Sequence, residues 1–300
     1  MPADPQYSCW VCGSGDVQKL QEGGFSGELS SENFAITDDE YGVTHAIFSC
    51  SNCGFRFCPE APDVLPFYEE LVDSAYEESR EPRRLQADSL LRCMRRWLPG
   101  GRGMRLLDVG AGSGILVEQA LAAGFDARGL EPSRWLAEQA SVRGLDVLVA
   151  TLPHPAIESA SCEVVTLVDV IEHVSDPARV LADIHACLKD DGLLFVVTPD
   201  VSSLAARLMG RRWWHYRLAH IAYFSPATLR RLGSEAGYEE VGFARPGWYF
   251  SLDYILQRLN QYLPAWLQLP VFHWMRSLRF PLNLGDSMLL VLRPRRQETQ

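Results

Sequence analysis

From residue 105 onward, apolar runs alternate with amphipathic segments along the chain. Runs at 105–109, 162–170 and 192–199 are almost continuously apolar, which is the pattern of strands buried on both faces of a sheet. The segments at 133–144 and 175–192 instead repeat apolar residues at helical spacing. This alternation predicts an α/β fold with a largely parallel sheet covered on both faces, and with ligands outside the carboxyl ends of its strands.

The same pattern divides the chain into three parts. Residues 1–60 hold a cluster of cysteines, and residues 61–103 form a proline-marked helical linker. Residues 104–300 carry the alternating pattern, with an interruption at about 247–285. We therefore expect a small N-terminal module, a linker and one large domain.

The interruption at 247–285 is rich in Trp, Leu and Phe and carries few charges. Such a segment needs apolar cover, which a second copy of the chain, an apolar acceptor beneath a lid, or a membrane surface would provide. Pro264 and Pro270 interrupt it too often for a membrane-spanning helix. Its role stays open among these three interpretations.

Composition narrows the possible classes of protein. The chain has 300 residues, of which 47% are hydrophobic and 22% charged, as in a globular enzyme. A formal net charge of −10 argues against a large nucleic-acid interface. The first residues show neither a basic region nor an apolar core, so we expect a cytoplasmic protein.

The cysteines near the N-terminus form two CxxCG units. The units are CWVCG, with Cys9 and Cys12, and CSNCG, with Cys50 and Cys53. Two thiolates three positions apart can bind one metal ion, and two such units make a tetrahedral site. We expect structural zinc rather than iron, because nothing else in the sequence indicates electron transfer. Buried free cysteines or a redox CxxC pair are the alternatives.

The segments 33–37 and 43–50 flank a turn-like stretch at 38–42. Strand-forming residues on both sides of such a turn predict a hairpin. The second CxxCG unit would then lie at the end of that hairpin.

A glycine-rich turn follows the first strand of the large domain. Gly110, Gly112 and Gly114 stand at alternate positions, and Glu131 ends the next strand, where an acidic side chain can bind ribose hydroxyls. Asp108 precedes the turn and would repel a pyrophosphate, whereas S-adenosylmethionine has no phosphate and carries two cationic groups. The GxGxG spacing also differs from the GxGxxG of NAD sites. S-adenosylmethionine is therefore favoured over NAD.

These residues resemble a known family. LDVGAGSG, LEPS and VVTLVDVIEHVSDPARVLADIHACLKDDGLLFVVTPD, within 105–245, are similar to class I S-adenosylmethionine-dependent methyltransferases, in the branch typified by ubiquinone-biosynthesis O-methyltransferases. The cysteine-containing segment resembles the zinc-binding segment of bacterial methyltransferases connected with sugar and cell-surface polysaccharide modification. The resemblance implies a Rossmann-like, doubly wound sheet of seven strands with an antiparallel last strand at 287–294, beside a small zinc-ribbon-like module.

The family pattern also implies roles for individual residues. Glu131 would bind the ribose, and Asp169 would lie near the methyl group. Many relatives have an acidic residue at the adenine contact, where this chain offers the backbone of Thr151 and Leu152. The residues implied to line the methionine part are Asp108, Gly110, Ala111, Gly112 and Gly114.

Two histidines are candidates for a general base. His173 lies just beyond the fourth strand of the pattern, where an acceptor would face the donor, and His220 matches a position where relatives often place a histidine. The alternatives are that His173 only holds its loop and that His220 only packs. Neighbouring Glu172 is expected to fix the loop rather than to react.

The leading hypothesis is a zinc-containing methyltransferase that uses S-adenosylmethionine and a small-molecule acceptor, such as a sugar or a lipid-linked compound. One alternative is an RNA or protein methyltransferase that reads its substrate with the cysteine module, although the acidic composition disfavours nucleic acid. A non-catalytic protein that binds the donor or assembles a complex is the alternative from another class. Homodimer or peripheral membrane contact through 247–285 is an accompanying expectation.

Overall fold

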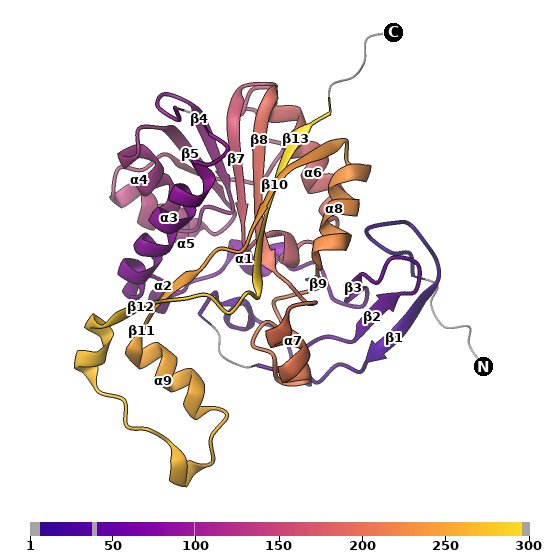
Figure 1. Cartoon of the computed structure of the whole chain (residues 1–300), viewed down its shortest axis with the longest axis vertical. Helices are drawn as coiled ribbons and strands as arrows, with labels where there is room; N and C mark the ends of the chain where they lie inside the picture. Colours follow the sequence, from indigo (N-terminus) through magenta and orange to yellow (C-terminus); the bar gives the residue numbers. More distant parts are fainter. Residues whose placement is uncertain (1–6, 38–40, 99, 296–300) are drawn as a thin grey trace.

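The computed structural model describes residues 7–37, 41–98 and 100–295 (Figure 1). Within these ranges the chain forms a seven-stranded sheet, a four-stranded sheet and a two-stranded ribbon. Figure 1 shows the four-stranded sheet beside the lower edge of the large sheet, and the ribbon on the opposite side of the molecule.

The central sheet confirms the predicted Rossmann-like architecture. Its strand order is β10-β13-β8-β7-β4-β5-β6. The pairs β4–β5, β4–β7, β5–β6 and β7–β8 are parallel, whereas β13 is antiparallel to both of its neighbours. The bounds are β4 (Arg105–Val109), β5 (Asp126–Glu131), β6 (Val147–Val149), β7 (Cys162–Val168), β8 (Leu188–Pro199), β10 (Tyr238–Ala244) and β13 (Ser287–Pro294).

Alternate residues of each central strand belong to two hydrophobic cores, one on each face of the sheet. Leu106 and Phe195 pack with helices on the first face, whereas Leu107 and Leu194 pack with helices on the second. The first face is covered by α3 (Arg80–Met94), α4 (Ile115–Ala122) and α5 (Arg134–Val142), and the second by α6 (Pro177–Cys187) and α8 (Pro226–Glu235). This double burial explains the nearly continuous apolar runs in the sequence.

The N-terminal sheet is completed by a strand from the large domain. β1 (Val17–Gln21), β2 (Ile47–Cys50) and β3 (Arg56–Phe57) are followed in space by β9 (Ala222–Tyr223), and every pairing is antiparallel. The rings of Phe55 and Phe224 lie 4.9 Å apart beside this junction. The cysteine module is therefore joined to the large domain by a shared sheet.

The hairpin predicted for 33–50 is wrong. Residues Ser31–Phe34 form a 3₁₀ helix, η1, and β2 pairs with β1 and β3 instead. Phe34 is fully buried and stacks on Phe67, so tertiary packing decides the conformation of this apolar segment. Residues 38–40 of the expected turn lie outside the described residues.

Short helices link the N-terminal sheet to the large domain. α1 (Leu65–Glu69) and α2 (Ser74–Glu78) precede α3, and the side chain of Asp73 caps α2 by accepting a hydrogen bond from the Tyr76 backbone. This arrangement places Tyr68 and Tyr76 in the wall of the cavity at the carboxyl ends of the central strands. The remaining short helices of the core are η2 (Ile171–His173), α7 (Leu204–Met209) and η3 (Gly210–Arg212).

The apolar interruption, which we call the insert, projects from one corner of the molecule (Figure 1). It consists of β11 (Trp248–Ser251), α9 (Leu252–Asn260), η4 (Ala265–Leu267), η5 (His273–Ser277) and β12 (Arg279–Leu282). β11 and β12 pair antiparallel at its base. None of the described helices is both long and apolar enough to cross a bilayer.

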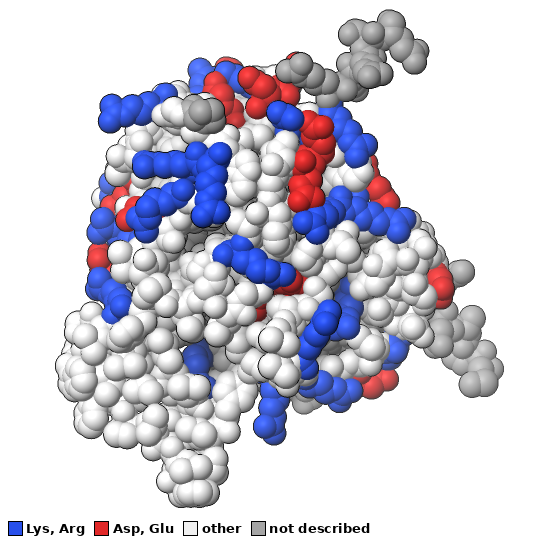
Figure 2. All heavy atoms as spheres, viewed as in Figure 1, with Lys and Arg blue, Asp and Glu red and all other residues white. Residues whose placement is uncertain are grey.

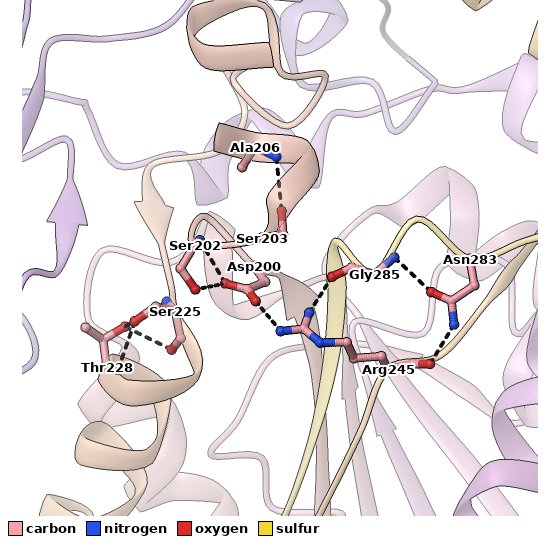
Figure 3. A network of polar contacts seen from close by, with 9 residues as sticks. All are labelled: Asp200, Ser202, Ser203, Ala206, Ser225, Thr228, Arg245, Asn283 and Gly285. Carbon is pink, nitrogen blue, oxygen red and sulfur yellow. Dashed lines mark hydrogen bonds and ion pairs between the residues drawn. The ribbon is translucent and has the colours of Figure 1, made fainter. Parts of the chain in front are cut away.

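An ion pair between an exposed arginine and a buried aspartate fixes the end of the insert to the sheet (Figure 3). The guanidinium of Arg245 lies 2.7 Å from the carboxylate of Asp200, a fully buried residue just after β8. Arg245 also donates to the carbonyl of Gly285, and its own carbonyl accepts from the Asn283 amide at 3.0 Å. These bonds hold the chain where it re-enters the sheet at β13.

Candidate functional site

A cavity of about 1140 Å³ lies at the carboxyl ends of β4, β5 and β7. Its wall comes from three regions of the chain: the glycine-rich turn, the linker helices with Tyr68 and Tyr76, and the insert with Tyr254. A volume of this size is larger than a single small cofactor needs, since ligand pockets commonly measure about 300–1,000 Å³. The cavity therefore has room for a donor and an acceptor together.

Two glycines of the glycine-rich turn have no space for a side chain. Gly110 has φ +77°, and an added Cβ would lie 2.3 Å from a methyl group of Val170. Gly112 has φ +54°, and an added Cβ would lie 2.7 Å from the hydroxyl of Tyr76. Both positions need glycine, because the backbone conformation and the close neighbours exclude a side chain. At these two positions the turn presents bare backbone to the cavity.

Gly114 differs from its predicted role. It precedes α4 with φ +75°, and an added Cβ would meet Leu145, Ala140 and Val147 rather than the cavity. Gly114 does not line the cavity. Its place in the sequence pattern instead reflects close packing of α4 against α5 and β6.

Glu131 organises the turn from the end of β5. One carboxylate oxygen accepts from the Gly112 amide at 2.7 Å, and the other accepts from the Ser133 amide at 2.8 Å. Burial raises the pKa of Glu131 to about 7, although the two backbone amides lower it in part. A buried carboxylate with lone pairs left over can accept further hydrogen bonds from ribose hydroxyls.

Two aspartates lie with Glu131 in the cavity wall, and we call the part of the wall formed by these three residues the acidic wall. Asp108 accepts a hydrogen bond from the Thr166 hydroxyl at 2.7 Å, and burial raises its pKa to about 7. Asp169, just after β7, has φ +52°, and burial raises its pKa to about 6. A left-handed backbone at a non-glycine residue is a strained conformation of the kind found at functional sites. Together with Glu131, these groups favour a cationic ligand.

The other predicted donor residues also lie in the cavity wall. Thr151 and Leu152 follow β6, and Ala111 belongs to the glycine-rich turn. The structure thus brings together residues from the ends of four strands, and their contact with the donor stays a prediction. The predicted donor residues that line the cavity are Asp108, Gly110, Ala111, Gly112, Glu131, Thr151, Leu152 and Asp169.

Both candidate histidines line the same cavity. The rings of His173 and His220 meet edge to face, with centroids 4.7 Å apart. The Nδ1 atom of His173 lies 2.8 Å from the carbonyl oxygen of Ala219 and 2.8 Å from the hydroxyl of Tyr68. Because a carbonyl can only accept, we assign the proton to Nδ1, which leaves the Nε2 lone pair of His173 available to accept a proton.

The histidines of this cluster are held neutral. Burial lowers the pKa of His173 to about 3, although the Ala219 carbonyl opposes this shift. Burial also lowers the pKa of His220 well below its usual value, and neighbouring His173 and Arg217 add to the effect. A neutral imidazole has the lone pair that a general base needs, but a pKa of about 3 makes His173 a weak base in this structure.

Glu172, Tyr68 and His215 lie beside the two candidate histidines. Glu172 is buried and accepts from the Thr198 hydroxyl at 2.9 Å, which agrees with its expected role in holding the loop. Its second carboxylate oxygen has no hydrogen-bond partner among the described residues. One ligand atom each from Glu172, His173 and His220 lies within 4.8 Å of the others, so this set could also hold a metal ion.

The sequence offers His215 and Tyr68 only as weak candidates, His215 for the acceptor site and Tyr68 for closing over a cofactor. His215 stacks on His220 with centroids 5.7 Å apart, and its Nε2 atom lies 3.6 Å from Asp286. Tyr68 reaches His173 from the linker helices. Each contact joins residues far apart in the chain, and neither residue stands in a recognisable local pattern.

An arginine connects the insert to the N-terminal part across the cavity. The guanidinium of Arg258, on α9, lies 4.6 Å from the ring centroid of Tyr41 and 4.7 Å from that of Tyr254. All three residues line the cavity. Stacking of this kind stabilises a partly buried cation and holds α9 against the loop that contains Tyr41.

The four predicted metal ligands converge in the N-terminal module. The Sγ atoms of Cys9 and Cys53 are 3.6 Å apart, as are those of Cys12 and Cys50, and all four lie within 4.8 Å of one another. Disulfide sulfurs would be about 2.05 Å apart. In a tetrahedral site with Zn–S bonds of about 2.3 Å, the sulfurs are about 3.8 Å apart. The cluster fits a zinc site.

Known proteins are similar to this chain over the large domain. Residues 76–241 match the family described as "Methyltransferase domain". The ubiquinone biosynthesis O-methyltransferase of Haemophilus ducreyi is 36% identical over 107 residues, which cover 32% of this chain and 45% of the relative. The protein of the same name from Methylococcus capsulatus is 30% identical over 161 residues, which cover 49% of this chain and 68% of the relative.

Solved structures share the fold. A S-adenosylmethionine-dependent methyltransferase from Archaeoglobus fulgidus superposes with a TM-score of 0.50 and 14% sequence identity, covering 74% of this chain and 100% of that one.

The chain spans less than half of the Haemophilus relative. The family match nevertheless extends over more than half of the present sequence and includes the glycine-rich turn and the acidic wall. The chain belongs to the methyltransferase-domain family and is a class I S-adenosylmethionine-dependent methyltransferase.

Proposed function

We propose that this methyltransferase transfers a methyl group to a hydroxyl of an apolar, lipid-linked small molecule. The observation that carries the proposal is the single cavity that contains both the acidic donor wall and an aromatic wall from the insert. Tyr249, Phe250 and Tyr254 contribute that aromatic wall, and Ile255 and Leu259 add aliphatic surface. An acceptor with an apolar chain would bury that chain against these side chains.

The histidine cluster supports an oxygen acceptor. Methyl transfer to a hydroxyl needs removal of the hydroxyl proton, and His173 lines the cavity with its Nδ1 bonded to the Ala219 carbonyl, which leaves Nε2 to accept that proton. The O-methyltransferase relatives named above support the same choice of acceptor atom. S-adenosylmethionine supplies the electrophilic methyl group, and the chain's own residues orient the reactants and exclude water.

A panel of acceptors tests this function. Purified protein with methyl-labelled donor would be offered phenols and saccharides, each with and without a long apolar tail. We expect transfer to the tailed compounds with a kcat/KM at least about tenfold above that of their tail-less partners, because several buried methylenes contribute. Equal use of tailed and tail-less acceptors contradicts the apolar acceptor. Donor binding without transfer to any member of the panel supports a non-catalytic binding protein.

Single replacement of His173 or His220 by alanine is expected to lower kcat by about 10²–10⁴ while the donor affinity stays within about threefold of wild type. The reason is that a general base acts on the acceptor and makes no bond to the donor. Turnover and calorimetric donor binding measure the two effects. His154→Ala is the matched control, because His154 does not line the cavity. Full activity in both variants would exclude the two histidines as bases.

Donor affinity is expected to fall as the pH drops below about 7. The pKa values of Asp108 and Glu131 are both raised to about 7, so these carboxyls are protonated below that pH and must lose protons to bind the cationic donor. The dissociation constant should rise by up to about tenfold per pH unit for each group that ionises. Calorimetry in buffers of different ionisation enthalpy would show the proton release. A dissociation constant that stays unchanged between about pH 8 and about pH 5.5, a range that spans both pKa values, contradicts this prediction.

We also propose that Cys9, Cys12, Cys50 and Cys53 hold one structural zinc ion. The distances between their sulfurs support this assignment. Four protein ligands leave no open position for water or substrate, which is the mark of a structural rather than a catalytic site. Gly13 and Gly54, each next to a cluster cysteine, have φ +68° and +75°, the left-handed conformation of a tight turn around a metal.

A further inference from the structure

The outer side of the insert exposes large aromatic side chains. Trp266 in η4 is 80% exposed, Trp274 in η5 is 59% exposed, and Phe272, directly before η5, is 49% exposed. Figure 2 shows the surface of the insert almost free of charged side chains. Apolar groups of this size seldom stand together in water without a partner.

A second group of exposed apolar residues adjoins the insert. Leu204 and Leu208 lie one turn apart on α7 and are 70% and 78% exposed. The hydroxyl of Tyr262, two residues beyond α9, donates to the carbonyl of Arg212 in η3 at 2.9 Å. This bond places η3, which directly follows α7, beside the insert. We call the combined surface the docking face: Leu204, Leu208, Trp266, Phe272 and Trp274, with Arg207, Arg211 and Arg212 beside them.

We propose that the docking face binds the surface of an anionic phospholipid bilayer. Tryptophan is suited to the boundary between headgroups and acyl chains, where its apolar ring is buried and its N–H stays in a polar layer. Short helices with exposed leucine and arginine side by side bind such surfaces by burying the leucine and leaving the arginine among the headgroups.

Charge complementarity favours an anionic bilayer. The whole chain has a formal net charge of −10. The segments 202–216 and 247–285 are instead net positive, because they contain several arginines and one acidic residue, Asp253. Asp253 is buried and pairs with Arg276 at 3.2 Å. The exposed arginines of η3 therefore lie in a locally basic region of an acidic protein. Negative headgroups attract such a region, with about 1 kcal/mol from each arginine near the surface.

A second copy of the chain fits this surface less well. In a symmetric dimer the same patch lies on both subunits, so the basic region of one copy would face the basic region of the other. The insert also projects away from the body, and residues 264–270 are all exposed on it. A projecting apolar loop beside cations is the shape of a bilayer contact rather than of a flat subunit interface.

The inner side of the same insert lines the cavity. Tyr249, Tyr254 and Leu259 contribute to the cavity wall, whereas Trp266 and Trp274 belong to the docking face. Docking would hold the acceptor half of the cavity near the membrane. This link to the acceptor rests on the proposed function, whereas bilayer binding itself depends only on the docking face.

Flotation with lipid vesicles tests the proposal with the full-length protein. We expect binding to vesicles of phosphatidylcholine with phosphatidylglycerol and much weaker binding to phosphatidylcholine alone, with affinity decreasing as salt rises. The double variant Trp266→Ser/Trp274→Ser should lower the partition coefficient by at least about tenfold. Arg211→Glu/Arg212→Glu should lower it by about fivefold or more for each arginine. Val142→Ser is the matched control, since Val142 is 78% exposed on α5, outside the docking face.

Unchanged donor affinity in each variant shows that the large domain is folded. Wild-type protein that fails to bind anionic vesicles, or binding that survives both double variants, overturns the proposal. A dimer in analytical ultracentrifugation that the tryptophan variant dissociates, without vesicle binding, also overturns it and identifies a second copy as the occupant. Vesicle binding without methylation of any tailed acceptor supports docking and contradicts only the proposed acceptor.

Discussion

Replacement of Glu131 by alanine is expected to raise the dissociation constant of S-adenosylmethionine by at least about a hundredfold. The variant would lack the hydrogen bonds that the Glu131 carboxylate is predicted to accept from the ribose, each worth about 1.5–3 kcal/mol because the acceptor is charged. The substitution would also leave the backbone amides of Gly112 and Ser133 without the carboxylate oxygens that now accept their hydrogen bonds. The turn that carries the donor site would then lose its order as well as its ligand contact.

Isothermal titration with the donor measures this effect, and two matched variants separate its causes. Glu131→Gln keeps one oxygen that can accept from a backbone amide, so we expect a smaller loss of affinity than with alanine. Glu138→Ala removes an exposed carboxylate from the neighbouring helix α5 and should leave affinity unchanged. An alanine variant at Glu131 that binds the donor within about threefold of wild type would show that the ribose contact lies elsewhere.

The second large effect is expected at the cysteine cluster. Cys50→Ser should reduce bound zinc from about one ion per chain to nearly none and unfold the N-terminal sheet, because structural zinc contributes about 10–16 kcal/mol to the folding of small domains. Cys50 ends β2, which pairs with both β1 and β3. Loss of this strand removes the centre of the sheet.

Metal analysis, thermal unfolding and limited proteolysis of residues 7–60 measure this change. Cys93→Ser is the matched control, because Cys93 lies on α3, outside the cluster, and should leave the zinc content at the wild-type value. A chelator added to the wild-type protein should reproduce the effect of Cys50→Ser. A zinc content well below one ion per chain in the wild type would exclude a structural zinc site. A Cys50→Ser variant that unfolds at the same temperature as the wild type would exclude it as well.

Local sequence patterns were enough to predict the alternating strands and helices of the central sheet, whereas its seven strands and antiparallel last strand were implied by the family resemblance. Buried strands show as continuous apolar runs, and helix starts show as capping residues: the Ser133 hydroxyl accepts from the Leu136 amide, and the Ser225 hydroxyl from the Thr228 amide. These signals lie within a few residues of each other. The Cys9–Cys12 and Cys50–Cys53 pairs are local in the same sense, which is why the cluster could be predicted.

Long-range packing decided the features that sequence patterns missed. Phe34 and Ile36 have the composition of a strand, yet Phe34 packs on the linker helices as part of a 3₁₀ turn. Gly114 shares the spacing of Gly110 and Gly112 but faces neighbouring side chains instead of the cavity. The contact of Tyr68 with His173 depends on how the linker crosses the sheet, and no local rule specifies that path.

The strand β9 that completes the N-terminal sheet also fixes an order of events during synthesis. The four cysteines leave the ribosome early. Arg56 and Phe57 of β3, in contrast, cannot form their strand pairing until Ala222 and Tyr223 of β9 have been synthesised. Until then the edge of β3 is unpaired, and an unpaired edge invites wrong association. Early binding of metal would hold the nascent module in register during this interval. Removing the module would later leave β9 and Phe224 of the finished domain exposed in turn.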